Sequence, residues 1–228
     1  ERRRPVIDIS RFADQWLVAT VRPKSVRINL PSVDQISVFS ARKDDLSDIS
    51  KNRDLAVENE PLIRASVAAT NGHYYVNAYP KLWRLDAATQ QWRMLGVDTE
   101  VHGFQVAPNN GTVAAYRIKG GFSKLYVSGD HGNTWTKYGN PSYVIMDIRF
   151  ANPNQGSAVR WNTGALSGTI ELWDYDRAND AWTKTSEAPA GCKQVFADAA
   201  QNVKLCVTPD GNILGKTDGK WGIEYAAY

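Results

Sequence analysis

Four tryptophans recur at nearly regular intervals along this chain of 228 residues, at positions 92, 135, 182 and 221. Before each of them a short apolar segment runs through an aspartate into a polar turn. These segments are Leu82–Asp86, Leu125–Asp130, Leu172–Asp176 and Ile213–Asp218. Another pair of apolar segments precedes each one, usually joined by a turn rich in Asn and Gly, which is the strongest short-range signal of a β-hairpin. Each unit of about 40–50 residues therefore predicts four antiparallel strands.

Five such units account for the chain, at about residues 5–60, 61–100, 101–142, 143–190 and 191–228. The first unit lacks the tryptophan, but its segment Val6–Ala13 resembles Val144–Ala151 of the fourth unit. Because a four-stranded unit cannot bury both of its faces alone, neighbouring units must stack around an axis. The sequence therefore predicts an all-β chain that folds as a single β-propeller domain with five four-stranded blades.

Two other architectures stay open, namely an incomplete propeller cut from a longer protein and a β-sandwich, although a sandwich does not predict this repeat. How the ring closes also stays open. The last unit could use its own C-terminal strand, Trp221–Tyr228, or part of the N-terminal segment.

The third unit carries the most distinctive turn of the chain, between Ser128 and Trp135. In such a turn Asp130 can accept backbone N–H groups and Gly132 supplies a positive φ, while the indole of Trp135 can cover the reversal. The residues with these roles, or next to them in the turn, are Ser128, Asp130, Gly132, Thr134 and Trp135. They match every fixed position of Ser-x-Asp-x-Gly-x-Thr-Trp, and the segment resembles the Asp-box, or BNR repeat, of sialidases and other β-propellers. The resemblance implies that this turn joins the third and fourth strands of a blade and lies away from an active site.

Two aspartates are the candidates for catalysis. Asp8 and Asp147 occupy matching positions on the predicted innermost strands of the first and fourth units. The chain resembles five-bladed propeller glycosidases of the arabinanase and invertase type, and the resemblance implies that such a pair could act as acid and as nucleophile or base. The other units offer no third carboxylate at this position. We therefore expect Asp8 and Asp147 to line a wet channel or to pair with Arg11 and Arg149.

Other candidates for chemistry are weaker. Sialidases use a Tyr–Glu pair, but the residues available here, Glu171 and Tyr175, fall in a predicted outer hairpin. The three histidines, His73, His102 and His131, lie in predicted turns or at strand starts, and His131 is expected to face solvent rather than a metal. The sequence thus predicts no catalytic residues, no cofactor and no metal site.

Cys192 and Cys206 flank a predicted strand, turn and strand whose centre falls at Ala199 or Ala200. The two arms are nearly equal, so the sulfurs would face each other across a hairpin, a geometry that permits a disulfide. A disulfide places the protein in an oxidising compartment, whereas the alternative is two reduced, buried thiols. With the disulfide we expect a secreted or periplasmic protein, whose abrupt start at Glu1 suits removal of a signal peptide.

Charge restricts the partners. The net charge of +3 and the absence of a long basic stripe argue against nucleic acid, and no apolar run is long enough to span a membrane. Two cationic loops are expected to project from the same end of their blades and to form a rim that attracts an acidic protein. Their basic residues are Arg22, Lys24 and Arg27 in the first unit and Arg117, Lys119 and Lys124 in the third.

These observations predict a non-catalytic, exported propeller that binds another protein through one face of the ring, as an assembly factor, adaptor, inhibitor or immunity protein would. A rigid disc of short hairpins offers a broad surface at a small entropic cost. One alternative is a glycoside hydrolase that works in the central channel through Asp8 and Asp147. The other is a carbohydrate-binding propeller that uses Trp161, Tyr79 or Tyr143.

Overall fold

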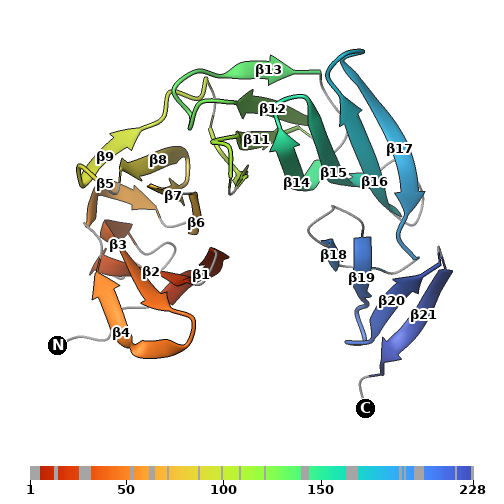
Figure 1. The fold of residues 1–228 in the computed structure, drawn as a ribbon, viewed down its shortest axis with the longest axis horizontal. Helices are drawn as coiled ribbons and strands as arrows, with labels where there is room; N and C mark the ends of the chain where they lie inside the picture. Colours follow the sequence, from red (N-terminus) through yellow and green to blue (C-terminus); the bar gives the residue numbers. More distant parts are fainter. Residues whose placement is uncertain are drawn as a thin grey trace. The chain divides into compact units, whose positions relative to one another are not determined.

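The computed structural model describes most of the chain. The described residues are 6–12, 15–25, 32–51, 54–61, 65–70, 72–86, 88–98, 100–107, 109–120, 122–139, 144–162, 169–189, 192, 194–197, 203–218 and 220–226. Within these ranges the regular structure consists of strands β1 to β21, and no helix occurs (Figure 1). The strands form five antiparallel sheets, and four of these sheets follow the order of the chain from edge to edge. The prediction of an all-β chain with five sheets is therefore confirmed.

The first sheet departs from the expected four strands. It contains β1 (Val6–Phe12), β2 (Gln15–Ser25), β3 (Ser32–Arg42), β4 (Asp45–Lys51) and β5 (Leu55–Pro61). Strand β3 is eleven residues long, and β4 pairs only with its second half, from Phe39 to Arg42. The first half, from Ser32 to Ile36, pairs with β5 instead. The fifth strand thus satisfies backbone groups of β3 that β4 is too short to reach.

The remaining sheets have four strands each and follow the chain as simple meanders. The second contains β6 (Ala65–Thr70), β7 (His73–Ala78), β8 (Lys81–Asp86) and β9 (Gln91–Met94). The third contains β10 (Gly103–Val106), β11 (Val113–Lys119), β12 (Phe122–Ser128) and β13 (Thr136–Tyr138). The fourth contains β14 (Val144–Asn152), β15 (Gln155–Asn162), β16 (Thr169–Asp176) and β17 (Ala181–Glu187). The fifth contains β18 (Gln194–Ala197), β19 (Val203–Val207), β20 (Ile213–Thr217) and β21 (Lys220–Tyr225).

The chain divides into two compact units, and the division runs through the third sheet. Unit 1 consists of Glu1–Arg117 and Tyr126–Thr136, and unit 2 of Ile118–Leu125 and Lys137–Tyr228.

The core of unit 1 lies between successive sheets. Alternate residues of β2 point to one face, where they pack on residues of β6 and β7. This cluster includes Leu17, Ala19, Val21, Val67, Ala69 and Val76. A second cluster joins β7 and β8 to β11 through Tyr75, Leu82, Val113 and Ala115, with Trp135 packed against it. A sheet that is apolar on both faces needs a neighbouring sheet on each side. The repeat in the sequence predicts such stacking for its units.

The core of unit 2 is partly aromatic. Tyr138 packs against Phe150 and Tyr175, and Tyr175 in turn packs against Trp182. The indole N–H of Trp182 donates to the backbone carbonyl of Gly139 at 3.1 Å, so the aromatic cluster also connects β17 to the segment that follows β13.

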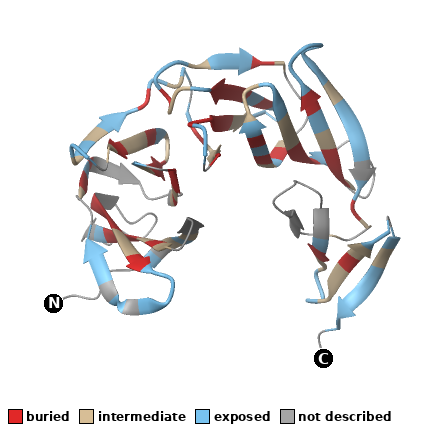
Figure 2. Ribbon diagram, viewed as in Figure 1, coloured by how far each residue is buried: buried red, intermediate tan, exposed pale blue. Residues whose placement is uncertain are grey.

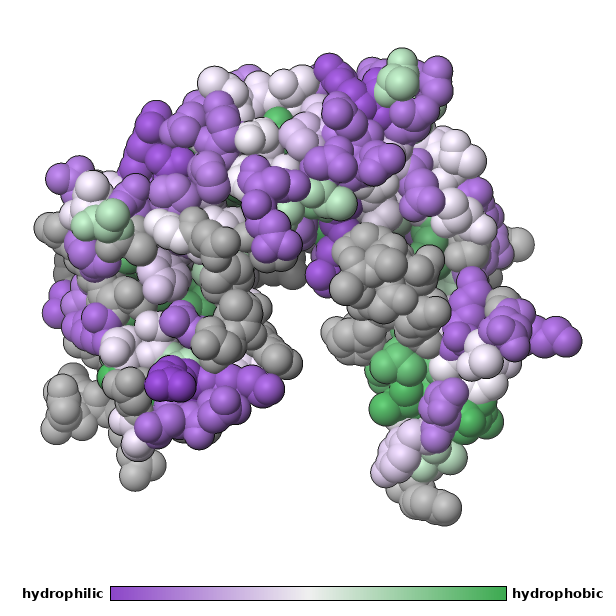
Figure 3. All heavy atoms as spheres, viewed as in Figure 1, coloured by the Kyte–Doolittle hydropathy of each residue, from purple (hydrophilic) through white to green (hydrophobic). Residues whose placement is uncertain are grey.

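Outer strands are the exposed part of the sheets. In Figure 2 the last strands of their sheets, such as β9 and β21, are mostly pale blue, whereas a strand further inside a sheet, such as β7, is largely buried. In the view of Figure 3, hydrophobic side chains gather over the last sheet, where Leu205, Ile223 and Tyr225 are exposed.

Candidate functional site

The turn between Ser128 and Trp135 is held by the side chains that the sequence singled out. Asp130 Oδ1 accepts from the Ser128 hydroxyl at 2.7 Å and from the backbone N–H of Thr134 at 2.9 Å. Its Oδ2 accepts from the Thr134 hydroxyl at 2.7 Å. The Gly132 N–H donates to Ser128 Oγ at 2.8 Å, and the Trp135 indole N–H donates to the Gly132 carbonyl at 3.1 Å. The turn is therefore a closed hydrogen-bonded unit.

Hydrogen bonding also determines the charge of this turn. Burial disfavours the ionised form of Asp130, but the bonds donated by Ser128, Asn133 and Thr134 outweigh it and lower the pKa of the carboxyl from 3.8 to about 2. Gly132 has a φ of +84°, and a Cβ at this position would lie 2.6 Å from Cδ1 of Leu95. The turn thus needs a glycine for its backbone and for its packing.

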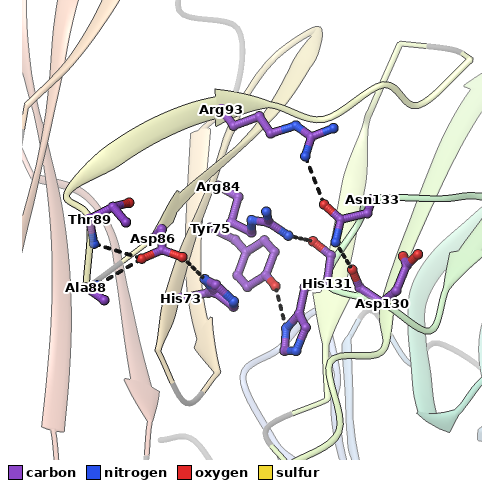
Figure 4. Close-up of polar contacts among 10 residues, drawn as sticks. All are labelled: His73, Tyr75, Arg84, Asp86, Ala88, Thr89, Arg93, Asp130, His131 and Asn133. Carbon is purple, nitrogen blue, oxygen red and sulfur yellow. Dashed lines mark hydrogen bonds and ion pairs between the residues drawn. The ribbon is translucent and has the colours of Figure 1, made fainter.

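A polar cluster connects this turn to the second sheet of unit 1 (Figure 4). In the register of β7 and β8, His73 lies opposite Asp86 and Tyr75 lies opposite Arg84. Because successive side chains of a strand alternate, these four residues share one face. His131 meets them from the turn. We call this group, His73, Tyr75, Arg84, Asp86 and His131, the histidine cluster.

The histidine cluster combines one short hydrogen bond with longer polar contacts and a ring contact. Arg84 Nη1 donates to the backbone carbonyl of His131 at 2.7 Å, and the Tyr75 hydroxyl lies 3.3 Å from His131 Nδ1. The rings of His73 and His131 are edge to face, with centroids 4.6 Å apart. Asp86 Oδ2 lies 3.7 Å from His73 Nδ1, within ion-pair reach but beyond a good hydrogen bond. Since burial raises the pKa of Tyr75 to about 12, its hydroxyl keeps its proton at neutral pH.

The expectation that His131 faces solvent is therefore wrong. His131 is half-buried, has a φ of +60°, and its ring packs on Gly111, where a Cβ would lie 2.6 Å from Nε2. Sequence reasoning missed the cluster because its partners are 47 and 56 residues away from His131. The one local signal was the position of His131 in a tight turn, because His, like Asn and Asp, is enriched among residues with a positive φ.

The two candidate catalytic aspartates each have structural partners. Asp8 lies in unit 1 and Asp147 in unit 2. Asp8 lies on β1, and its carboxylate accepts the backbone N–H of Ile9 at 2.9 Å and of Val67 on β6 at 2.7 Å. Asp147 lies on β14, accepts from the N–H of Ile148 at 2.9 Å and forms an ion pair with Arg149 at 3.1 Å. The side chain of Arg11 lies outside the described residues. Asp8 thus joins the first sheet to the second, and Asp147 has the arginine partner expected for it.

The cationic residues fall near strand ends. Arg22 is exposed on β2, Lys24 lies on the same strand but its side chain is not described, and Arg27 lies outside the described residues. Arg117 on β11 pairs with Glu100 at 3.2 Å, which balances its charge. Lys119 and Lys124, on the hairpin of β11 and β12, are exposed.

Between these two lysines lies a residue that the sequence reasoning did not select. Phe122 begins β12 and is 56% exposed. The next residue, Ser123, is buried, and its hydroxyl accepts the backbone N–H of Ile145 at 2.9 Å. The hairpin is therefore anchored directly behind Phe122. The available signal was a phenylalanine straight after a Gly-Gly turn, where a core residue would not be expected.

The aromatic residues of the carbohydrate alternative have different environments. Trp161 on β15 is 47% exposed. Tyr79 is half-buried, and its ring meets the ring of His102 at a centroid distance of 5.0 Å. Tyr143 lies outside the described residues. Within the part of the chain that the structure describes, no group of three or more His, Cys, Asp or Glu side chains is arranged to hold a metal ion.

A buried charged group also lies in the fourth sheet. Glu171 is 4% exposed and accepts from Asn162 at 3.1 Å, Trp173 at 2.9 Å and Lys184 at 3.1 Å. Burial opposes its ionisation, but these bonds outweigh it and lower the pKa of Glu171. Arg160, its cross-strand neighbour, stacks on the Trp173 ring at 3.9 Å. This arrangement gives Glu171 a structural place in its sheet, in keeping with the outer-hairpin position expected for it.

Cys192 and Cys206 form a disulfide, with Cα atoms 5.9 Å apart. The register is not the one expected. Cys206 on β19 lies opposite Val195, and Cys192 precedes β18. The bond therefore ties the segment entering the hairpin to its second strand, rather than linking two opposed positions. In the described residues there is no helix long and apolar enough to cross a membrane.

Comparison with known proteins identifies the fold. No family model and no curated protein matches the chain. A structure of a nidogen/laminin complex matches with a TM-score of 0.58 and 11% identity, over 96% of this chain and 78% of the other. A structure of oligogalacturonate lyase in complex with manganese matches with a TM-score of 0.57 and 10% identity, over 92% of this chain and 61% of the lyase. Identities this low show the fold alone, and they confirm the predicted fold class: the chain is a β-propeller built from antiparallel blades.

Proposed function

We propose that this chain is a non-catalytic, exported β-propeller that binds another protein through the end of its blades that carries Lys119, Phe122 and Lys124. One observation carries the proposal: a large apolar side chain is 56% exposed between two exposed lysines on an anchored hairpin. Buried aromatic anchors surrounded by polar residues supply most of the energy of protein interfaces. We call residues 119–124 the binding tip.

The chemistry of the tip favours an acidic partner. Lys119 and Lys124 have no carboxylate partner among the ion pairs of the described residues, unlike Arg117, which is held by Glu100. Free cations at the edge of an apolar anchor raise association rates with negatively charged surfaces. On the sequence alone we also keep Arg22, Lys24 and Arg27 in the proposed cationic rim, because they occupy the corresponding stretch of the first repeat.

Three further observations support the proposal. The nidogen/laminin structure shows that a propeller of this fold occurs in a protein complex. Asp8 and Asp147 have backbone and arginine partners, which suits polar structural residues. The disulfide suits an oxidising compartment, either secreted or periplasmic. We propose in addition that the Ser128–Trp135 turn is an Asp-box and that residues 1–228 form one domain of five blades.

The binding tip can be tested by comparing proteins captured from the native extracellular or periplasmic fraction. The bait proteins are the wild type, Phe122→Ala and the double variant Lys119→Glu/Lys124→Glu. The matched control is Lys137→Glu, which reverses an exposed lysine on β13, outside the tip. A partner that uses the tip is retained by wild type and control and lost by both tip variants.

Salt dependence separates the contributions of charge and of apolar contact. Capture by the wild type should weaken as ionic strength rises, because exposed charges are screened. Phe122→Ala should weaken capture at every salt concentration. Equal capture by all four proteins would contradict the proposal, and binding to an immobilised glycan panel that depends on Trp161 would favour the carbohydrate alternative.

A further inference from the structure

We propose that the histidine cluster is an acid-sensitive joint, which holds the Ser128–Trp135 turn against the second blade at neutral pH and releases it when the pH falls below about 6.5. The histidine cluster belongs to unit 1 and the binding tip to unit 2, so the inference does not depend on the proposed partner.

The geometry places two imidazoles and one guanidinium together at the contact between the turn and the second blade. The rings of His73 and His131 are 4.6 Å apart, and Arg84 reaches past them to the carbonyl of His131. Figure 4 shows that His73, Tyr75, Arg84 and Asp86 come from one sheet and His131 from the facing turn. Protonation of His73 therefore adds a positive charge beside a permanent cation and a second imidazole, at the contact itself.

The groups that face His73 come from every neighbouring element. Arg84 and Asp86 lie on β8, Tyr75 on its own strand β7 and His131 on the turn, while the β6 residue opposite His73 is the uncharged Thr70. Among the described residues, Asp86 is the group whose charge favours the protonated ring. Its carboxylate also accepts the backbone N–H groups of Ala88 and Thr89 at 2.9 Å, which hold it in the turn between β8 and β9.

The balance of these groups agrees with the geometry. Burial, followed by Arg84 and His131, lowers the pKa of His73 below 6.5, and Asp86 only partly opposes this. A histidine with a lowered pKa binds fewer protons in the folded than in the unfolded chain. Its contribution to stability is complete above pH 6.5 and is lost as the pH falls from 6.5 towards the lowered value. Opening the contact relieves the unfavourable charge, because His73 then gains water.

The opening should be local. The turn is attached to the second blade by Arg84, by the bond from Arg93 Nη1 to Asn133 Oδ1 at 3.0 Å, and by apolar packing. In that packing Gly132 lies against Leu95, and Trp135 packs on the cluster that contains Leu95. Its internal bonds centre on Asp130, whose pKa of about 2 keeps it ionised throughout this range. The turn can therefore stay folded while it separates from the blade.

The first test is an NMR titration of the three histidines in the full chain. His73 should titrate below 6.5. In His131→Asn its midpoint should rise, because one neighbouring imidazole is removed, and Asn tolerates the positive φ at this position. The matched control is His102→Asn, which removes the histidine that packs on Tyr79 and should leave the midpoint of His73 unchanged. A midpoint of His73 at or above 6.5, or no change in His131→Asn, would overturn the proposal.

The second test measures where the chain opens. Hydrogen exchange, corrected for its intrinsic pH dependence, should rise several-fold in peptides covering 128–138 between pH 7.5 and 5.5. Peptides covering 144–162 should change much less. In the His73→Gln variant the rise in exchange should disappear. If His73→Gln fails to fold, His131→Asn takes its place, and in that variant the rise should be smaller than in the wild type. The same rise in the substituted protein, or a uniform rise along the chain, would show that the histidine cluster is not an acid-sensitive joint.

Discussion

Arg84 of the second blade donates a hydrogen bond to the backbone carbonyl of His131 at 2.7 Å, and this bond links a strand to a turn that lies 47 residues away in the sequence. The acceptor is a main-chain atom, so the contact depends on the conformation of the turn rather than on the identity of the side chain at 131. The donor is charged and half-buried, which makes it one of the stronger contacts between blades in unit 1.

Replacement of Arg84 by Met should therefore destabilise the protein by about 1.5–3 kcal/mol, the range for a hydrogen bond that involves a charged group. Met keeps the length of the side chain and removes the donor. Arg84→Lys is the control, since it retains the charge but not the planar geometry, and should fall between Met and wild type. Urea unfolding at pH 7.5 measures the difference. A loss of stability below 0.5 kcal/mol, the lower end of the range for ordinary hydrogen bonds, would contradict this account.

Asp130 should make the protein sensitive to acid at low pH. Its folded pKa of about 2 lies below the reference value of 3.8, so its stabilising contribution is complete above pH 3.8 and is lost as the pH falls towards 2. After allowance for solvent screening we expect a contribution of about 1 kcal/mol. Asp130→Asn should lower stability at pH 6 and flatten the dependence on pH between 4 and 2. Unfolding curves recorded across this range, compared with the wild type, provide the measurement.

Two glycines with similar backbone angles separate strain from packing. Gly132 has a φ of +84° and is packed on Leu95, whereas Gly72 has a φ of +80° and open space around it. Gly72→Ala should cost about 1 kcal/mol, from the left-handed backbone alone. Gly132→Ala should cost clearly more, because a Cβ would also meet Cδ1 of Leu95 at 2.6 Å.

The packing part of this difference can be checked with a double-mutant cycle. Leu95→Ala removes the atom that the new Cβ would meet, so the loss caused by Gly132→Ala should be smaller in that background than in the wild type. Equal losses in both backgrounds would show that the backbone strain at position 132, and not its contact with Leu95, determines the need for glycine.

The disulfide should contribute to stability through the unfolded chain. Cys192 and Cys206 are separated by 14 residues, and closing a loop of about this size is worth about 3 kcal/mol in the loop-entropy model. Cys192→Ala/Cys206→Ala and the reduced wild type should both unfold at lower denaturant concentration than the oxidised protein. Coincident unfolding curves for oxidised and reduced wild type would contradict the prediction.

Much of the fold could be predicted because the relevant information is local. Each blade is a series of hairpins, and a hairpin is specified by a few turn residues between alternating apolar runs, as in Asn109-Asn110-Gly111. The bonds of Asp130 to Ser128 and Thr134 span at most four residues. Such contacts follow from residue type and spacing, so the sequence was sufficient to predict the Asp130 turn and the five sheets.

Other features depended on contacts between residues far apart. Strand β5 pairs with β3 because β4 covers only half of that long strand. The strand propensities of the residues do not predict which strands will pair. The disulfide register and the exposure of Phe122 likewise depend on how neighbouring segments pack. The binding tip was therefore only partly anticipated, through its lysines.

The sequence alone determined the repeat, the four-stranded meander of the later blades and the chemistry of the turns, because hairpins and turns are set within a few residues. Only the tertiary structure decided that His131 lies against Tyr75 and Arg84, and that Asp8 accepts the N–H of Val67 59 residues away. The reason is physical: a hydrogen bond within a turn is closed by the chain itself, whereas a contact between blades exists only after two sheets have packed on each other.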